Sequence, residues 1–87
     1  MKENASYYVY IVQCADGNLY TGTAKDLHSR IDKHNQGQGA KYTRGRLPVT
    51  LVYSEKVDSK SEALKREMAI KWMTRPAKLA LIKSNQN

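Results

Sequence analysis

At 87 residues the chain has room for one small domain with a modest core and for no second binding module. Fifteen Lys and Arg residues against eight Asp and Glu give a formal net charge of +7, which favours a polyanionic partner, nucleic acid before an acidic membrane surface. No apolar run approaches about 18 residues and no signal-peptide pattern is present, so we expect a cytoplasmic protein with no membrane association. Charge alone fits a soluble basic protein without such a partner equally well.

Cysteine and histidine usage limits the metal and disulfide chemistry of the chain. Cys14 is the only cysteine, which excludes an internal disulfide bond. A zinc site would depend on His28, His34 and carboxylates, without the paired spacing that is typical of zinc ligands.

The N-terminal half predicts a β-hairpin followed by a helix. Tyr7–Cys14 is rich in aromatic and β-branched residues, which is typical of a strand buried on both faces. Residues 15–18 supply turn chemistry, and Leu19–Thr23 follows as the partner strand. Asp26 is suited to cap a helix that runs to about Asn35.

The C-terminal half predicts one more strand and two helices. Gln36–Pro48 contains several glycines and is expected to lack regular structure. Val49–Val57 alternates well enough to form a third strand. Ser59 and Glu62 have the spacing of a capping box, and the helix that they open should stop or bend near residues 75–76 because proline clashes with a continuing helix.

This order of elements, ββαβαα, predicts an α/β (α+β) fold in which a three-stranded antiparallel sheet is flanked by helices. We expect residues 1–87 to form a single domain. Its core would cover about 6–75, a short final helix 76–83, and a frayed tail 84–87.

Charged side chains occupy core-facing positions on both main helices. Glu67 lies within the apolar stripe of the helix expected over Ser61–Thr74. Arg30 and His34 share a face with Ile31 on the first helix. A carboxylate removed from water is costly unless a cation, hydrogen-bond donors or a metal ion compensates it. We therefore expect a reaction centre between the two helices.

Two tyrosines fall on the predicted hairpin. Because side chains alternate along a strand, Tyr10 shares a face with Val12, and Tyr20 shares one with Gly22. Gly22 has no side chain, which allows another group to approach the sheet closely. A single strand tyrosine is more often a packing residue, but a pair followed by an arginine and a histidine on the next helix favours a chemical role.

At these positions the chain resembles the GIY-YIG nuclease family. Residues 8–10 (Tyr-Val-Tyr) stand where the family has Gly-Ile-Tyr, and residues 20–22 (Tyr-Thr-Gly) stand where it has Tyr-Ile-Gly. Arg30 follows Tyr20 by the family's ten-residue step, and His34 lies one turn later. Glu67 matches the family's metal-binding glutamate. The resemblance covers about residues 6 to 75 and is strongest to the small single-domain bacterial branch and to the GIY-YIG subunit of structure-specific endonucleases.

The chain departs from the family signature at two strand positions. Tyr8 replaces the first glycine and Thr21 replaces the second isoleucine. Both are tolerable, because the matching catalytic positions are Tyr10, Tyr20 and Gly22. The chain has no length for the extra DNA-binding region of relatives that cut at defined sequences, so the resemblance supports the chemistry better than it supports a particular target.

The resemblance implies metal-dependent endonuclease activity on nucleic acid, DNA before RNA, with branched or repair intermediates among the substrates. Glu67 would hold one Mg²⁺ or Mn²⁺, since such an ion accepts one carboxylate and completes its shell with water and phosphate. Tyr10 would orient or deprotonate the attacking water, and Tyr20 would hydrogen-bond to that water or to Tyr10. Arg30 would clamp the phosphate, and His34 would relay a proton or donate to phosphate. A phenol, whose pKa is normally about 10, acts as a base only if a cation such as Arg30 or the metal lowers that pKa.

A positively charged flap is expected beside this centre. Lys41, Arg44 and Arg46 lie in the glycine-rich segment and would contact the nucleic-acid backbone without reading sequence, with Gly22 leaving room at the sheet. An ordinary solvated loop explains the same composition.

Simpler structural roles stay open for the charged residues. Glu67 would pair with Lys71 or with Arg30. His34 would interact with the helix dipole, and Arg30 would cover Ile31 with its aliphatic stem.

Two other functions also stay open. The first is a nucleic-acid-binding module of this fold with weak or partner-dependent cleavage, in which a protein partner supplies substrate specificity. The second is a small basic scaffold that binds another protein.

Overall fold

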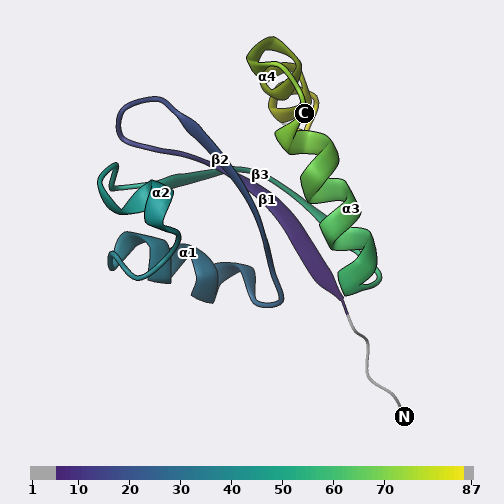
Figure 1. Ribbon diagram of the computed structural model, residues 1–87, viewed down its shortest axis with the longest axis horizontal. Coiled ribbons are helices and arrows are strands. Elements are labelled where there is room, and N and C mark those ends of the chain that lie inside the picture. Colours follow the sequence, from purple (N-terminus) through teal and green to yellow (C-terminus); the bar gives the residue numbers. More distant parts are fainter. Residues whose placement is uncertain (1–5, 86–87) are drawn as a thin grey trace.

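The computed structural model describes residues 6–85, in which a three-stranded antiparallel sheet separates two pairs of helices (Figure 1). The strands lie in the order β2-β1-β3, so β1 is central. The predicted fold class is therefore confirmed, with one helix added. In chain order the elements are β1 (Tyr7–Gln13), β2 (Leu19–Ala24), α1 (Leu27–Asn35), α2 (Lys41–Arg44), β3 (Thr50–Val57), α3 (Lys60–Lys71) and α4 (Arg75–Ser84).

Both faces of β1 are buried, as its composition predicts. Val9 and Ile11 pack with Ile70 in the core between the sheet and α3. Tyr10 and Val12 point to the opposite face, where side chains of α1 cover them. Figure 1 shows α1 and α2 on one side of the sheet and α3 and α4 on the other. The central strand thus directs Tyr10 toward α1.

Side-chain caps define where the helices begin. Asp26 and Ser59 each accept a hydrogen bond of 3.1 Å from the backbone N–H three residues later, as predicted. The third helix ends at Lys71, earlier than expected, and Thr74 caps a separate helix. Pro76 lies in the first turn of that helix, where a backbone N–H would have no helical partner. The short final helix is present, beginning at Arg75, and proline lies in its first turn instead of following its end.

The segment Gln36–Pro48 contains a helical turn that the sequence did not predict. Residues 40–44 lie between two glycines but contain neither glycine nor proline themselves. The Ala40 carbonyl accepts the Thr43 N–H at 3.1 Å and the Thr43 hydroxyl at 2.9 Å, which closes the turn that begins α2. The observed order is thus ββααβαα.

The β2 strand forms one edge of the sheet, and α3 packs against both β1 and β2. This edge is where residues from the two faces of the sheet can approach one another. At the C-terminus Ser84 is still helical, and residues 86–87 of the expected frayed tail lie outside the described residues. Over residues 6–85, no helix combines the length and apolar character needed to cross a membrane.

Candidate active site

The Tyr10 side chain lies across Gly22 of the neighbouring strand. The two residues are directly opposite each other in the β1–β2 pairing, so they share a face of the sheet. A Cβ atom on Gly22 would lie only 2.6 Å from the Tyr10 hydroxyl oxygen. Gly22 therefore makes room for the phenol, and the space above it is not free for nucleic acid.

A Gly22→Ala substitution is expected to lower the free energy of unfolding by about 1–3 kcal/mol, because the added methyl group would displace the Tyr10 hydroxyl. Urea denaturation measures this change. Gly45→Ala is the matched control: its Cβ would meet no atom within 4 Å and its φ is −92°, so we expect a change within about 0.5 kcal/mol. Equal losses in the two variants would contradict the steric argument.

A buried chain of hydrogen bonds starts at the Tyr10 hydroxyl. It joins Tyr10 to His34 Nε2 at 2.8 Å, His34 Nδ1 to the Thr43 hydroxyl at 2.9 Å, and that hydroxyl to the Ala40 carbonyl at 2.9 Å. A carbonyl oxygen only accepts, so Thr43 donates to Ala40 and accepts from His34 Nδ1–H. In a neutral imidazole Nε2 is then the acceptor, and Tyr10 donates its proton to it. Each side chain in this series therefore donates a hydrogen bond to the next group, and the imidazole of His34 accepts from Tyr10 and donates to Thr43.

Burial and nearby charges keep Tyr10 and His34, the first two groups of this hydrogen-bonded series, neutral. Burial lowers the pKa of His34, and the nearby Arg30 guanidinium lowers it further. Burial raises the pKa of the Tyr10 hydroxyl, and Arg30 offsets only part of that rise. A negative charge on Glu67 also raises the Tyr10 pKa. The Tyr20 ring packs edge-on against His34, with ring centroids 5.5 Å apart. The net shift of Tyr10 is opposite to the one that base action needs.

The lowered pKa of His34 makes stability depend on pH. Below the ordinary histidine pKa of about 6.5, His34 binds a proton in the unfolded chain but stays unprotonated in the folded protein. We expect the free energy of unfolding to be fully retained above this pH and to fall, by up to about 1 kcal/mol per pH unit, as pH drops from there through the folded pKa. Denaturation at several pH values should show this fall reduced in His34→Gln and kept in the control His28→Gln. An unchanged fall in His34→Gln would contradict the assignment.

Arg30 presents an unused donor to the same centre. Its side chain is half-buried, and its Nε is one of two buried side-chain atoms without a hydrogen-bond partner among residues 6–85; the other is Thr21 Oγ1. A buried guanidinium N–H without a partner is costly, and a phosphate oxygen would satisfy it. Arg30 is therefore suited to bind an anion.

Glu67, the candidate carboxylate of this centre, lies on α3. Its side chain is 19% exposed, and its Oε2 lies 3.2 Å from Lys71 Nζ, so the intrahelical ion pair considered above is present. The described part of the chain contains no group of three or more His, Cys, Asp or Glu residues that would hold a metal ion. One carboxylate fits Mg²⁺ or Mn²⁺ only if water and phosphate oxygens supply the other ligands.

Known proteins resemble this chain over most of its length. Residues 6–80 match the profile of the GIY-YIG catalytic domain. The chain belongs to the GIY-YIG family. It is 64% identical over 78 residues to a UPF0213 protein of Staphylococcus aureus. The matched segment covers 90% of this chain and 95% of that protein.

Two solution NMR structures share the GIY-YIG fold of this chain. The UPF0213 protein of Bacillus halodurans has 45% sequence identity and a TM-score of 0.61, with 92% of this chain and 85% of that chain covered. A protein of E. faecalis has 36% identity and a TM-score of 0.62, with 100% of this chain and 94% of that chain covered.

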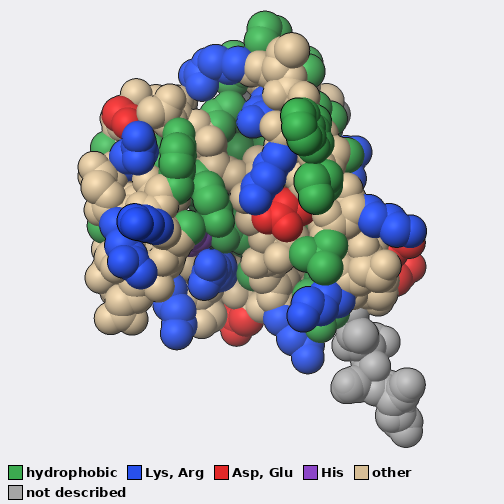
Figure 2. All heavy atoms as spheres, viewed as in Figure 1, with side chains coloured by type: hydrophobic (Ala, Val, Ile, Leu, Met, Phe, Trp, Pro, Cys, Tyr) green, Lys and Arg blue, Asp and Glu red, His purple; other side chains and the backbone are tan. Residues whose placement is uncertain are grey.

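The basic residues expected in a flap of this GIY-YIG domain have different surroundings. Arg46 is held in place: its Nε lies 3.0 Å from Asp16, and its Nη1 donates to the Tyr42 carbonyl at 2.7 Å. Lys41 and Arg44 are exposed. Figure 2 shows Lys and Arg side chains spread over the face of the molecule that it draws, with few acidic side chains between them. Arg46 thus anchors α2 to the hairpin turn, and Lys41 and Arg44 remain candidates for backbone contact.

Two residues that sequence reasoning gave no role lie against His34. Thr43 orients His34, and Gly39 lacks the Cβ atom that would collide with the His34 ring. Both act through the unpredicted turn that contains α2. The one available signal was the short interval between His34 and Thr43, which does not by itself indicate contact.

Proposed function

We propose that this domain is an endonuclease that hydrolyses phosphodiester bonds of nucleic acid in a metal-dependent reaction, with DNA preferred over RNA and with branched or repair intermediates as substrates. The observation that carries this proposal is the convergence on the Tyr10 hydroxyl. His34 is hydrogen-bonded to it at 2.8 Å, and the Tyr20 ring lies 5.5 Å from the His34 ring between centroids. The charges of Arg30 and Glu67 shift the Tyr10 pKa. Four different elements contribute these side chains. Core packing alone does not require such a set, and the net charge of +7 suits a polyanionic substrate.

Glu67 and Arg30 would divide the binding of the scissile phosphate. Glu67 would hold one Mg²⁺ or Mn²⁺, which when bound neutralises charge on the phosphate and on the leaving oxygen. Arg30 would donate from its unpartnered Nε to a phosphate oxygen on the other side. Lys41 and Arg44, both exposed, would contact neighbouring phosphates.

The two tyrosines would have distinct roles toward the attacking water. Tyr20 is half-buried and borders open space, whereas Tyr10 is fully buried, so Tyr20 would orient the water. Tyr10 would take a proton from that water as its own proton moves to His34 Nε2. Thr43, which holds Nδ1–H, would keep Nε2 free to accept it.

A cleavage assay tests this proposal. Purified protein is incubated with branched, single-stranded and duplex DNA, and with RNA, in Mg²⁺, Mn²⁺ or EDTA. We expect products on DNA only with a metal ion. Cleavage that survives EDTA would exclude the metal role. DNA binding that weakens steeply with salt, without product in any metal, would favour the binding module, and the absence of salt-sensitive binding would favour the protein scaffold.

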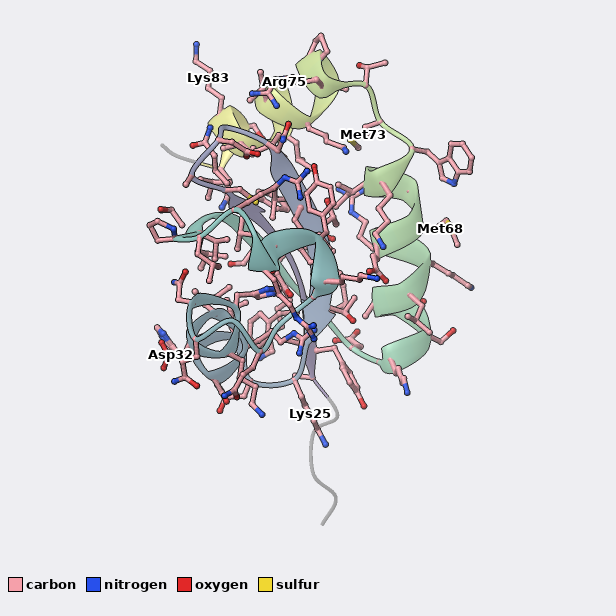
Figure 3. All side chains as sticks on the ribbon, turned by 60° about the vertical axis from the view of Figure 1, so that its left-hand side comes forward. Lys25, Asp32, Met68, Met73, Arg75 and Lys83 are labelled. Carbon is pink, nitrogen blue, oxygen red and sulfur yellow. The ribbon has the colours of Figure 1, made fainter. Side chains whose placement is uncertain are left out.

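Partner-dependent cleavage is supported by a separate surface. Leu64 and Met68 on α3 and Trp72, the residue that caps its C-terminal end, follow one another at four-residue spacing. They are 49%, 58% and 81% exposed. Figure 3 shows Met68 directed away from the sheet. An apolar stripe in water is typical of a protein-binding surface. If the isolated domain is slow, we propose that a protein docked on this stripe positions the substrate.

Thr43→Val is expected to lower the cleavage rate about 10- to 100-fold, because the buried His34 Nδ1–H loses its acceptor and Nε2 is no longer held as the free nitrogen. The ¹⁵N shifts of the imidazole report this tautomer change directly, in the absence of substrate. Thr43→Ser, which keeps the hydroxyl, should restore both the rate and the shifts. A Val variant with parental imidazole shifts would refute the orienting role.

A further inference from the structure

An open pocket borders the candidate active site, and of its lining residues only Tyr20 has a role in the proposed hydrolysis. Its volume is about 300 Å³, and β2, α2, α3 and α4 all contribute to its walls. Tyr20 lines this pocket and also packs against His34, the hydrogen-bond partner of Tyr10, with ring centroids 5.5 Å apart. A ligand in the pocket would therefore lie next to the reacting phosphate. The lining residues are Leu19, Tyr20, Thr21, Tyr42, Lys71 and Lys78.

The charge of the pocket lining is positive. Lys71 and Lys78 contribute two ammonium groups, and no lining residue is acidic. Lys71 is paired with Glu67, whereas Lys78 has no ion-pair partner within the described residues. An anionic group would be attracted to this end of the pocket.

A buried polar atom in the lining lacks a partner. Thr21 is 3% exposed, and its hydroxyl makes no hydrogen bond within residues 6–85. A buried hydroxyl without a partner costs free energy that a ligand oxygen or nitrogen would recover. This second, independent observation indicates a polar ligand.

The opposite wall is aromatic. Tyr42 stacks on Tyr20 with ring centroids 5.9 Å apart and an interplanar angle of 22°, and Arg46 lies 4.2 Å from the Tyr42 ring centroid. Tyr42 is nevertheless 42% exposed, so part of the residue remains accessible to a ligand beside these two contacts. Exposed aromatic rings beside cations are the surface on which unpaired nucleobases stack.

We propose that this pocket binds one unpaired nucleotide of the substrate strand, adjacent to the phosphodiester that is cut. The base lies against Tyr42, a polar edge of the nucleotide reaches the Thr21 hydroxyl, and its phosphate lies near Lys71 and Lys78. The inference rests on the proposed function for its substrate class and adds a requirement: the strand is single-stranded at this nucleotide, because a base within a duplex has both faces covered by its neighbours. Substrates with a flap or another unpaired segment at the cut are then preferred over continuous duplex.

Binding is tested with thymidine 5′-monophosphate and the full chain in EDTA, where no hydrolysis contributes. NMR titration should move the signals of Thr21, Tyr42 and Lys78 together and saturably. Thymidine and inorganic phosphate, titrated separately, should each bind at least about tenfold more weakly. If phosphate shifts these signals as much as the nucleotide does, the pocket is a simple anion site. If none of the three signals shifts, the nucleotide does not bind in the pocket. Either result overturns the proposal.

Variants locate the site. Tyr42→Ala should weaken nucleotide binding about tenfold, while Tyr42→Phe, which keeps the ring, should bind like the parent. Thr21→Val keeps the shape of the side chain and should also weaken binding. Lys78→Met is compared with Lys83→Met, which removes an exposed charge from the other end of α4; Figure 3 shows Arg75 and Lys83 at the two ends of this helix. Equal losses for the two lysine variants would indicate a general charge effect and would contradict the site.

The outcomes separate this inference from the proposed hydrolysis. If the nucleotide binds in a Tyr42-dependent way but no substrate is cut, the pocket stands and the nuclease proposal fails. If DNA is cut but Tyr42→Ala leaves the preference for unpaired DNA unchanged, the nuclease proposal stands and the pocket is refuted.

Discussion

Glu67→Gln is expected to lower the rate of Mg²⁺-dependent cleavage about 10²- to 10³-fold while the domain stays folded. Glutamine keeps the shape of the side chain but replaces the carboxylate by a neutral carbonyl, which is a much weaker ligand for a divalent ion. The ion pair with Lys71 also disappears. Because Lys71 is 49% exposed, losing this ion pair should change the free energy of unfolding by less than about 1 kcal/mol. A large effect on rate with a small effect on stability is the result that distinguishes metal binding from an ordinary ion pair.

Single-turnover cleavage over a range of Mg²⁺ concentrations measures the Glu67 effect. Glu62→Gln is the control, because Glu62 is an exposed carboxylate in the first turn of the same helix. Its rate should match that of the parent. A full rate in Glu67→Gln, or an equal loss in Glu62→Gln, would reject the assignment of Glu67 as the metal ligand.

Arg30→Met is expected to have a similarly large effect on cleavage, about 10²-fold or more, without a loss of stability. The substitution removes a cation and a buried Nε that has no partner within the described part of the chain. Deleting an unsatisfied donor does not carry the usual cost of a core substitution. It also removes the charge that lowers the pKa of both Tyr10 and His34, so both values should rise. The acid side of the pH–rate profile should therefore move to higher pH.

Two further variants sharpen the Arg30 test. Arg30→Lys keeps the charge but not the planar donor fork, so it should restore only part of the rate. Lys33→Met removes an exposed cation from the same helix and should leave cleavage unchanged. If Arg30→Met binds and cuts DNA as well as the parent, Arg30 does not clamp the phosphate.

The elements that sequence reasoning predicted correctly depend on residues close together in the chain. Asp26 and Ser59 cap their helices because a side-chain oxygen and a backbone N–H three residues later meet in any helical first turn. The run Tyr7–Gln13 forms the central strand because only a strand covered on both faces buries so continuous an apolar segment. The convergence of Tyr10 with Arg30, Tyr20 and Glu67 was expected from the family resemblance and stays a prediction.

The helical turn of α2 was not predictable in the same way. Its four residues are too few to show a periodic pattern, and its first turn closes through hydrogen bonds to Ala40. Because α2 was missed, so were the contact of Thr43 with His34 and the stacking of Tyr42 on Tyr20. The anchoring of Arg46 to Asp16, 30 residues earlier, is equally a product of the folded chain.

By itself the sequence determined the class of fold and the starts of α1 and α3, because periodicity, capping and strand alternation are local properties of the chain. Its resemblance to the family indicated the residues from which a nuclease site would be built. Only the tertiary structure decided the protonation states at that site. Whether Tyr10 donates to His34, and whether its pKa rises or falls, depends on how deeply the two groups are buried and on which charges from other elements surround them. Burial and the spacing of charges arise when distant segments pack together, and no local pattern contains them.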